Sequence, residues 1–149
     1  MIAYTLNKET FNKSYNLQTT HLYKKIWTDE YVQIMDLLIK QFNTEYKWDG
    51  MFTLDDVTKR IDSGEHLFIL FVSDTPIGYI WFKELTNSIC SMYNLYISRI
   101  IKRPDFSSVW FINKVCKEMI KYYDQIDTGC EDWHITMQKT FTLNGFTEV

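Results

Sequence analysis

Residues 89–123 read ICSMYNLYISRIIKRPDFSSVWFINKVCKEMIKYY, and this stretch decides the fold. Its first part, Ile89–Ser98, is rich in β-branched and aromatic side chains without clean alternation, which predicts a central strand covered on both faces. After Pro104, Ser107 or Ser108 can cap a helix. The apolar side chains of this helix recur at steps of three and four residues: Val109, Ile112, Val115, Cys116, Met119, Ile120 and Tyr123. The stretch therefore predicts a strand, a loop and a long amphipathic helix.

Two further helices are expected upstream of this stretch. Thr28 can cap the first, whose apolar face would consist of Tyr31, Ile34, Met35, Leu38, Ile39 and Phe42. Thr53 precedes a second, shorter helix, since Asp55 and Asp56 would lie in a first turn where the helix dipole favours negative charge. The pair Ser63-Gly64 would end that helix.

The remaining segments predict strands. Residues 66–72 and 77–83 are β-rich runs joined by the turn 73–76, which predicts a hairpin. Residues 2–6 alternate weakly and predict an edge strand, whereas residues 7–18 are polar and predict a loop.

Beyond the long helix, Gln125–Glu131 predicts a strand and Ile135–Leu143 a short helix closed by Asn144-Gly145. Phe146–Val149 predicts a last strand. The expected order is β-α-α-β-β-β-α-β-α-β, an α+β fold with a mixed, mostly antiparallel sheet flanked by helices. No linker or repeat interrupts residues 1–149, so we expect a single domain.

Composition excludes several classes of function. Apolar residues make up 46% of the 149 residues and aromatic residues 17%, which is too much for a disordered chain. The formal net charge of −3 offers no broad basic field, so neither a nucleic acid nor a membrane is an expected partner. The three cysteines have no C-x-x-C spacing, and no signal peptide or membrane-spanning run is visible, so we expect a reduced, soluble, cytoplasmic protein. The three histidines do not form metal-ligand spacings with them, so no metal is expected.

Taken together, these elements resemble the GNAT superfamily of acyl-CoA-dependent N-acetyltransferases, from about Thr28 to Val149. Only the combination of features is specific. It consists of the two N-terminal helices, the hairpin with Pro76-Ile77-Gly78-Tyr79, the strand Asn94-Leu95-Tyr96-Ile97-Ser98 leading to a long helix, and the terminal Asn144-Gly145-Phe146. The resemblance implies a protein that transfers an acetyl group from acetyl-CoA to an amine by direct attack on the thioester.

The resemblance also implies a cofactor site. In the family, a loop with the pattern Q/R-x-x-G-x-G/A and the following helix N-terminus bind the pyrophosphate of coenzyme A, and residues 103–108, RPDFSS, align with it. Phe106 replaces the first glycine of the pattern. The pyrophosphate would be held by Arg103 and by the amides of Ser107, Ser108 and Val109. The alternative, a plain strand-loop-helix junction with a serine cap, stays open.

Catalytic roles are likewise implied by the resemblance. If the central strand bulges as in relatives, the amides of Ile97 and Ser98 would stabilise charge on the thioester carbonyl. Glu84 is the candidate base, and His134 is a second one, each with a plain alternative as a surface charge or a helix cap. The tyrosine that the family places four residues before the terminal Gly-Phe is Phe141 here, which is expected to be a core residue.

A rival hypothesis is a GNAT-fold binding or assembly module without catalysis, which Phe106 and Phe141 favour. Some phages encode such proteins, and the single alanine, Ala3, indicates an AT-rich source compatible with a phage. The enzyme hypothesis requires an amine acceptor, either a small molecule or a protein. The module hypothesis requires a protein partner.

Overall fold

The computed structural model describes residues 1–13, 21–26, 31–46, 53–98 and 107–149. Its elements are β1 (Ile2–Asn7), β2 (His21–Ile26), α1 (Tyr31–Tyr46), α2 (Leu54–Asp62), β3 (His66–Val72), β4 (Thr75–Glu84), β5 (Ile89–Ile97), α3 (Ser107–Met119), β6 (Gln125–Cys130), α4 (Ile135–Leu143) and β7 (Thr147–Glu148). The predicted α+β class and the predicted element order are confirmed, and β2 is an addition to them.

The chain divides into two compact units. The central unit consists of Thr20–Phe82 and Asn94–Arg103, and the terminal unit consists of Met1–Thr19, Lys83–Tyr93 and Pro104–Val149. β4 and β5 contribute residues to both units. The expectation of a single domain stays a prediction.

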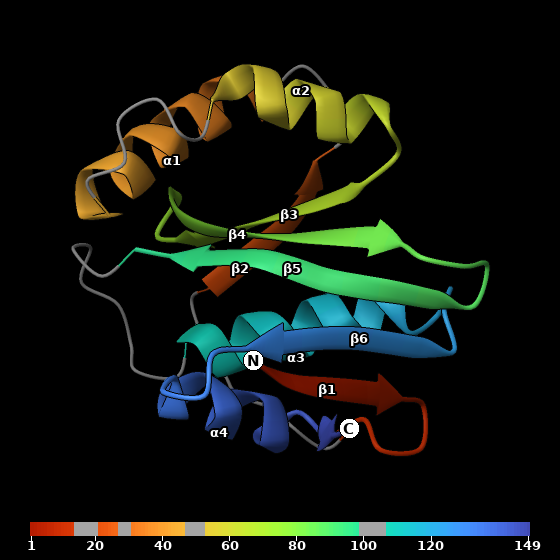
Figure 1. Cartoon of the computed structure of the whole chain (residues 1–149). Coiled ribbons are helices and arrows are strands. Elements are labelled where there is room, and N and C mark those ends of the chain that lie inside the picture. The colour runs from red at the N-terminus through yellow and green to blue at the C-terminus, as the bar shows by residue number, and fades with distance from the viewer. Residues whose placement is uncertain (14–20, 27–30, 47–52, 99–106) are drawn as a thin grey trace. The chain divides into compact units, whose positions relative to one another are not determined.

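In the central unit, β2 pairs antiparallel with β3, and β3 pairs antiparallel with β4. Figure 1 shows α1 and α2 together on one side of these strands. The sequence predicted no element at β2, His21–Ile26, which carries two lysines and a weak apolar pattern. An edge strand needs only one partner and tolerates lysine, which explains why the sequence pattern hid it.

The hairpin of β3 and β4 is tighter than expected. Ser73 and Asp74 both have positive φ, 50° and 66°, as in the turns that match the twist of two-residue hairpins. The strand therefore resumes at Thr75, and Pro76 pairs with Phe71 beside a register shift. β3 and β4 are buried along most of their length, whereas buried and half-buried residues alternate along the start of β5. The expectation of full coverage for β5 was wrong.

α2 begins as the sequence predicts. Thr53 Oγ1 accepts from the Asp56 amide at 3.3 Å, and Asp56 Oδ2 accepts from the Thr53 amide at 3.0 Å. This reciprocal capping box satisfies two amides that a helix start leaves without intrahelical partners. α2 ends at Asp62; Ser63 is its C-cap and is followed by Gly64 with φ of 87°.

The terminal unit has the strand order β5-β6-β1-β7. β1 lies between β6 and β7 and is antiparallel to both, while β5 and β6 are parallel. Helices α3 and α4 belong to the same unit and lie beside these strands (Figure 1). Leu6, Phe111, Val115, Cys116, Met119 and Ile126 are fully buried and form the centre of its core.

Candidate functional site

A β-α-β crossover organises the terminal unit. Ile89–Ser91 of β5 pair in parallel with Gln125–Asp127 of β6, and α3 connects the two strands. A short turn joins Met119 to β6, so α3 runs antiparallel to β6 and begins near the C-terminal end of that strand. Ligands of α/β crossovers bind at this end of the strands, and a helix N-terminus favours anions there.

The parallel pairing of β5 and β6 is short. It ends at Ser91 and Asp127, although β5 continues to Ile97 and β6 to Cys130. Directly beyond it, Thr128 Oγ1 donates to the carbonyl oxygen of Met92 at 2.9 Å, so a side chain takes the place of the next backbone bond. The regular ladder thus stops where the two strands approach the N-terminal end of α3.

In the central unit, β5 is irregular at Asn94, which has φ of 53°. Asparagine is among the few residues that adopt this left-handed conformation readily. With the amide oriented to satisfy both groups, its side-chain oxygen accepts from the Arg60 guanidinium, which also lies 5.5 Å from the centre of the Trp81 ring. β5 is therefore irregular at Asn94, whose side chain contacts α2, while the bulge expected from the resemblance stays a prediction.

The two candidate residues at the end of β5, Ile97 and Ser98, differ in their environment. The Ser98 amide donates to the Ile77 carbonyl at 2.8 Å, and Ser98 Oγ donates to Glu45 Oε1 at 2.5 Å, so this buried serine is committed to its neighbours. Successive amides of a strand point to opposite edges, so the Ile97 amide lies on the edge away from β4. The Ser98 amide therefore already has a partner in Ile77, whereas the Ile97 amide stays a prediction for the thioester carbonyl.

The glycine of the motif Pro76-Ile77-Gly78-Tyr79 is required by the close approach of β4 to β5. A Cβ at this position would overlap the carbonyl oxygen of Tyr96, so only glycine lets β4 approach β5 this closely. The Ser98–Ile77 hydrogen bond lies directly beside this contact.

The predicted pyrophosphate site is described in part. Arg103 and Phe106 lie outside the described residues. Ser107 and Ser108 both belong to the first turn of α3, so the capping position precedes them; Ser107 is buried and Ser108 half-buried. The amide of Ser108 has no carbonyl partner within a helix at this position, which is the arrangement that binds anions.

The first turn of α3 is held by a residue whose role sequence reasoning missed. Asn144 Nδ2 donates to the Val109 carbonyl at 3.3 Å and to the Thr140 carbonyl at 3.0 Å. The Asn144 carbonyl in turn accepts from the Asn12 amide at 3.1 Å. The Asn-Gly-Phe motif was visible in the sequence, but its distant partner Val109 could be found only in the fold.

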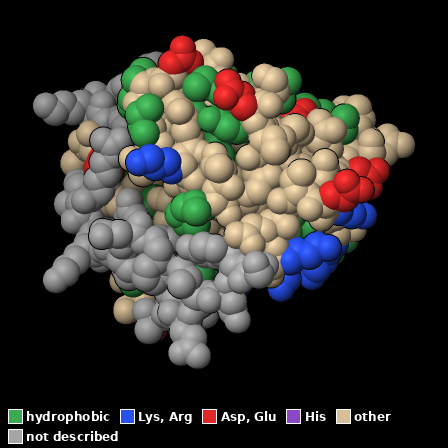
Figure 2. Space-filling view, turned by 90° about the horizontal axis from the view of Figure 1, so that it is seen from below, with side chains coloured by type: hydrophobic (Ala, Val, Ile, Leu, Met, Phe, Trp, Pro, Cys, Tyr) green, Lys and Arg blue, Asp and Glu red, His purple; other side chains and the backbone are tan. Residues whose placement is uncertain are grey.

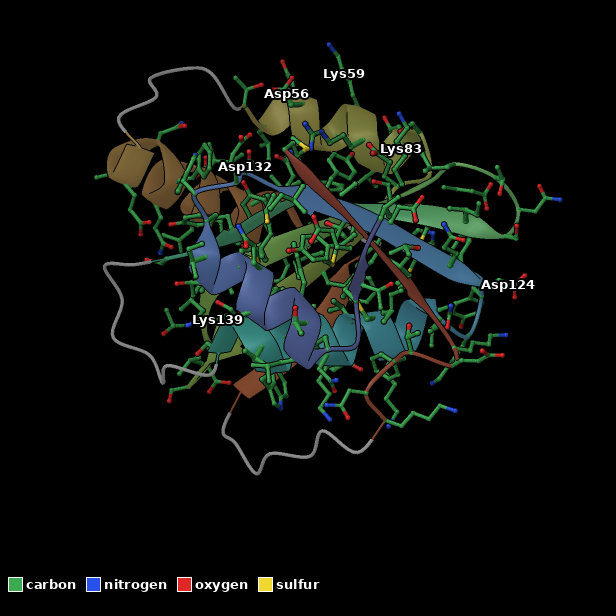
Figure 3. The ribbon with its side chains drawn as sticks, turned by 60° about the horizontal axis from the view of Figure 1, so that its bottom comes forward. Asp56, Lys59, Lys83, Asp124, Asp132 and Lys139 are labelled. Carbon is green, nitrogen blue, oxygen red and sulfur yellow. The ribbon has the colours of Figure 1, made fainter. Side chains whose placement is uncertain are left out.

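Glu84 lies at the other end of α3. Its Oε1 accepts from the Tyr123 hydroxyl at 2.9 Å. Burial, and then the hydrogen bond and charge of Glu84, raise the pKa of Tyr123 to about 12. Figure 3 labels Asp124, which follows Tyr123 and precedes β6, and Asp132, which lies beyond the other end of β6. α3 is about 18 Å long from Ser107 to Met119, so the structure does not bring Glu84 to the predicted pyrophosphate site.

His134 caps α4. Its Nδ1 accepts from the Met137 amide at 3.3 Å, which places the ring proton of the neutral form on Nε2. The Trp133 ring stacks on it at 5.2 Å, and Trp133 is 73% exposed. His134 follows the C-terminal end of β6, the end at which α3 begins.

Phe141 is a core residue, as expected. It is 2% exposed, and its ring lies 5.3 Å from each of the rings of Tyr4 and Phe146. α4 therefore supplies no hydroxyl at the position where the resemblance placed an acid.

Other classes of site find no support in the described part of the chain. It holds no cluster of metal-ligating side chains and no helix long and apolar enough to cross a membrane. Cys90, Cys116 and Cys130 are free thiols, all buried, and burial raises the pKa of each. The face in Figure 2 carries both acidic and basic side chains, in keeping with the small net charge.

Comparison with known proteins finds similarity at the level of structure. No family model and no curated protein matches the chain. AAC(6')-Iy in complex with a CoA-containing bisubstrate analogue matches with a TM-score of 0.65 and 14% identity over 86% of this chain and 91% of that one. The aminoglycoside acetyltransferase meta-AAC0020 from an uncultured soil metagenomic sample matches with a TM-score of 0.62 and 8% identity over 83% and 87% of the two chains. A tandem GNAT protein from the clavulanic acid biosynthesis pathway matches with a TM-score of 0.64 and 14% identity; it covers 99% of this chain, which spans 49% of its length.

Proposed function

We propose that this chain, which has the fold of the GNAT acetyltransferases, binds acetyl-CoA and transfers its acetyl group to an amine. The observation that carries the proposal is the β5-α3-β6 crossover, whose parallel pairing stops after three residue pairs at the end where α3 begins. This arrangement supports a phosphate site at the first turn of α3.

Different residues are proposed to bind the pyrophosphate and the thioester of acetyl-CoA. Arg103 and the amides of Ser107, Ser108 and Val109 hold the pyrophosphate, with Phe106 in the same loop. Asn144 fixes the carbonyl of Val109 and so orients this turn. The Ile97 amide donates to the thioester carbonyl and stabilises the oxyanion that forms when the amine attacks.

The acceptor is a primary amine of a small molecule or a protein. It must lose a proton before it attacks, and Glu84 and His134 stay predictions for that role. Both already have partners, Glu84 the Tyr123 hydroxyl and His134 the Met137 amide.

A second candidate function, a non-catalytic binding module, is favoured by Phe141. Its ring fills the core where a hydroxyl donor would be needed, and an acid is typically worth about 10²- to 10⁴-fold in rate. An enzyme with this core would rely on water to protonate the departing thiolate. A partner protein is expected for this candidate instead of an acceptor.

Thermal unfolding with and without acetyl-CoA tests the cofactor site. A ligand at 100 times its Kd stabilises the native state by about 2.7 kcal/mol. We expect an upward shift in Tm that Arg103→Ala and Ser108→Asp remove. Ser108→Asp adds a charge that helix α3 tolerates at its start but that repels phosphate.

Thr136→Asp is the matched control, because it adds the same charge to the first turn of α4 at an exposed position. It should leave the shift intact. An unshifted Tm of the wild-type protein at millimolar acetyl-CoA would reject the proposal.

A further inference from the structure

We propose that the surface around Ile135, at the start of α4, binds the same surface of a second copy of this chain across a two-fold axis. The surface consists of Glu131, Trp133, Ile135 and Lys139, and we call it the Ile135 surface. All four side chains are exposed, and all four belong to the terminal unit. The inference goes beyond the proposed acyl transfer and does not depend on it.

The centre of the Ile135 surface is apolar and open to solvent. Trp133 is 73% exposed and Ile135 is 54% exposed, although large apolar side chains are mostly buried in folded proteins. Met1 is exposed as well and lies beside them, since its amine is 3.3 Å from Asp132 Oδ1. Neighbouring apolar side chains that stay exposed mark sites of contact with other proteins.

The Trp133 ring is held in one orientation. It stacks on the His134 ring at 5.2 Å with 9° between the two planes, and His134 Nδ1 accepts from the Met137 amide at 3.3 Å. A side chain that is already ordered loses little conformational entropy on binding. Tryptophan is also enriched among the few residues that carry most of the binding energy of an interface. Trp133 is therefore suited to anchor a protein interface.

The charges around Ile135 explain why the partner is a second copy. Glu131 precedes Ile135 by four residues, and Lys139 follows it by four. Figure 3 labels Asp132, a second carboxylate before α4, and Lys139, on α4. A two-fold axis near Ile135 brings the acidic side of each copy to the basic side of the other, so Glu131 of one chain meets Lys139 of the other. An apolar centre with opposite charges on its two sides is thus complementary to itself.

Other occupants fit the Ile135 surface less well. A nucleic acid or an anionic membrane would meet the carboxylates of Glu131 and Asp132 directly beside Trp133, and like charges repel. A different protein as the partner would leave the wild-type chain monomeric, which the following experiment distinguishes.

Sedimentation velocity over a series of concentrations, from low to high micromolar, measures the Kd of the dimer. We expect the wild-type chain to dimerise within this range. Trp133→Ala should raise the Kd at least about 30-fold, which corresponds to the ~2 kcal/mol of an anchoring residue. Tyr122→Ala is the matched control, because Tyr122 is a similarly exposed aromatic residue, at 69%, near the opposite end of β6. It should leave the Kd unchanged.

Charge reversal tests the two-fold arrangement itself. Lys139→Glu places two carboxylates together at both symmetric contacts, and Glu131→Lys places two ammonium groups together. Each variant alone should raise the Kd at least about tenfold. An equimolar mixture of the two variants should dimerise like the wild type, because one chain then carries only acidic and the other only basic groups at these contacts. This recovery also shows that neither variant is misfolded.

A wild-type chain that stays monomeric at every concentration would overturn the inference. A dimer whose Kd is the same in Trp133→Ala would overturn it as well, since association would then use another surface. Charge variants that dimerise like the wild type on their own, or that fail to recover in the mixture, would exclude the two-fold pairing. Urea unfolding of each variant should match the wild type, because every substituted side chain is exposed.

Discussion

Gly145 follows the last turn of α4, and replacing it with alanine should destabilise the protein far more than the same change at Gly64. Both glycines stand directly after a helix and have positive φ, 96° and 87°. Alanine in this conformation costs about 1 kcal/mol at either site. A Cβ on Gly64 meets nothing within 4 Å, whereas a Cβ on Gly145 would overlap the carbonyl oxygen of Thr10.

The second cost at Gly145 follows from what must move. Relieving the overlap separates the loop around Thr10 from the end of α4. That separation strains two hydrogen bonds of Asn12, from its amide to the Asn144 carbonyl at 3.1 Å and from its Nδ2 to the Leu143 carbonyl at 2.9 Å. At about 1 kcal/mol for each bond, Gly145→Ala should cost about 3 kcal/mol in total, against about 1 kcal/mol for Gly64→Ala.

Urea unfolding followed by tryptophan fluorescence and circular dichroism measures both costs. For a domain of this size, about 3 kcal/mol corresponds to a Tm lower by about 6–12 °C, and the control should lose about 2–4 °C. Equal losses for the two variants would refute the reasoning, since they would mean that the Thr10 contact contributes nothing beyond backbone strain.

Two further predictions concern ionisable groups. Thr53→Ala should destabilise the protein by about 1 kcal/mol at neutral pH, because it removes half of the capping box. The hydrogen bonds from Thr53 lower the pKa of Asp56, so this stabilisation is present above the ordinary aspartate pKa and should fade as the pH falls below it. The difference in free energy of unfolding between the wild type and Thr53→Ala, measured by urea unfolding, should therefore shrink from pH 7 to pH 3. A constant difference over this range would contradict the prediction. Tyr123 has its pKa raised to about 12, so an unfolded chain loses this proton first and native stability should decline as the pH rises above 10. Absorbance of ionised tyrosine should show a late-titrating group that Tyr123→Phe removes and Glu84→Gln shifts toward the ordinary value; early titration of all tyrosines would exclude the buried pair.

Local patterns in the sequence predict most of the elements. The start of α2 after Thr53 was predicted because the signals of a helix start are local, and the capping box found there joins Thr53 and Asp56, three residues apart. The spacing of apolar residues after Ser107 marks α3 for the same reason, since a helix repeats locally. β2 was missed because an edge strand depends on its neighbour β3 more than on its own side chains.

The site was less predictable because its contacts join distant residues. Ser98 meets Ile77 and Glu45, which are 21 and 53 positions away, and no local pattern encodes either contact. Glu84 was a reasonable candidate as a carboxylate at a strand end, but its bond to Tyr123 depends on where α3 stops.

The bond from Asn144 to Val109 has a consequence for how tightly an anion could bind. A loop that must be ordered by its ligand spends part of the interaction energy on that ordering. Here the carbonyl side of the first α3 turn is already anchored to the end of α4, and Gly145 and Asn12 anchor that end in turn. The first turn of α3 is thus held by a segment outside the proposed phosphate site. If the proposed function holds, substitutions around residue 144 should therefore weaken acetyl-CoA binding without a direct contact.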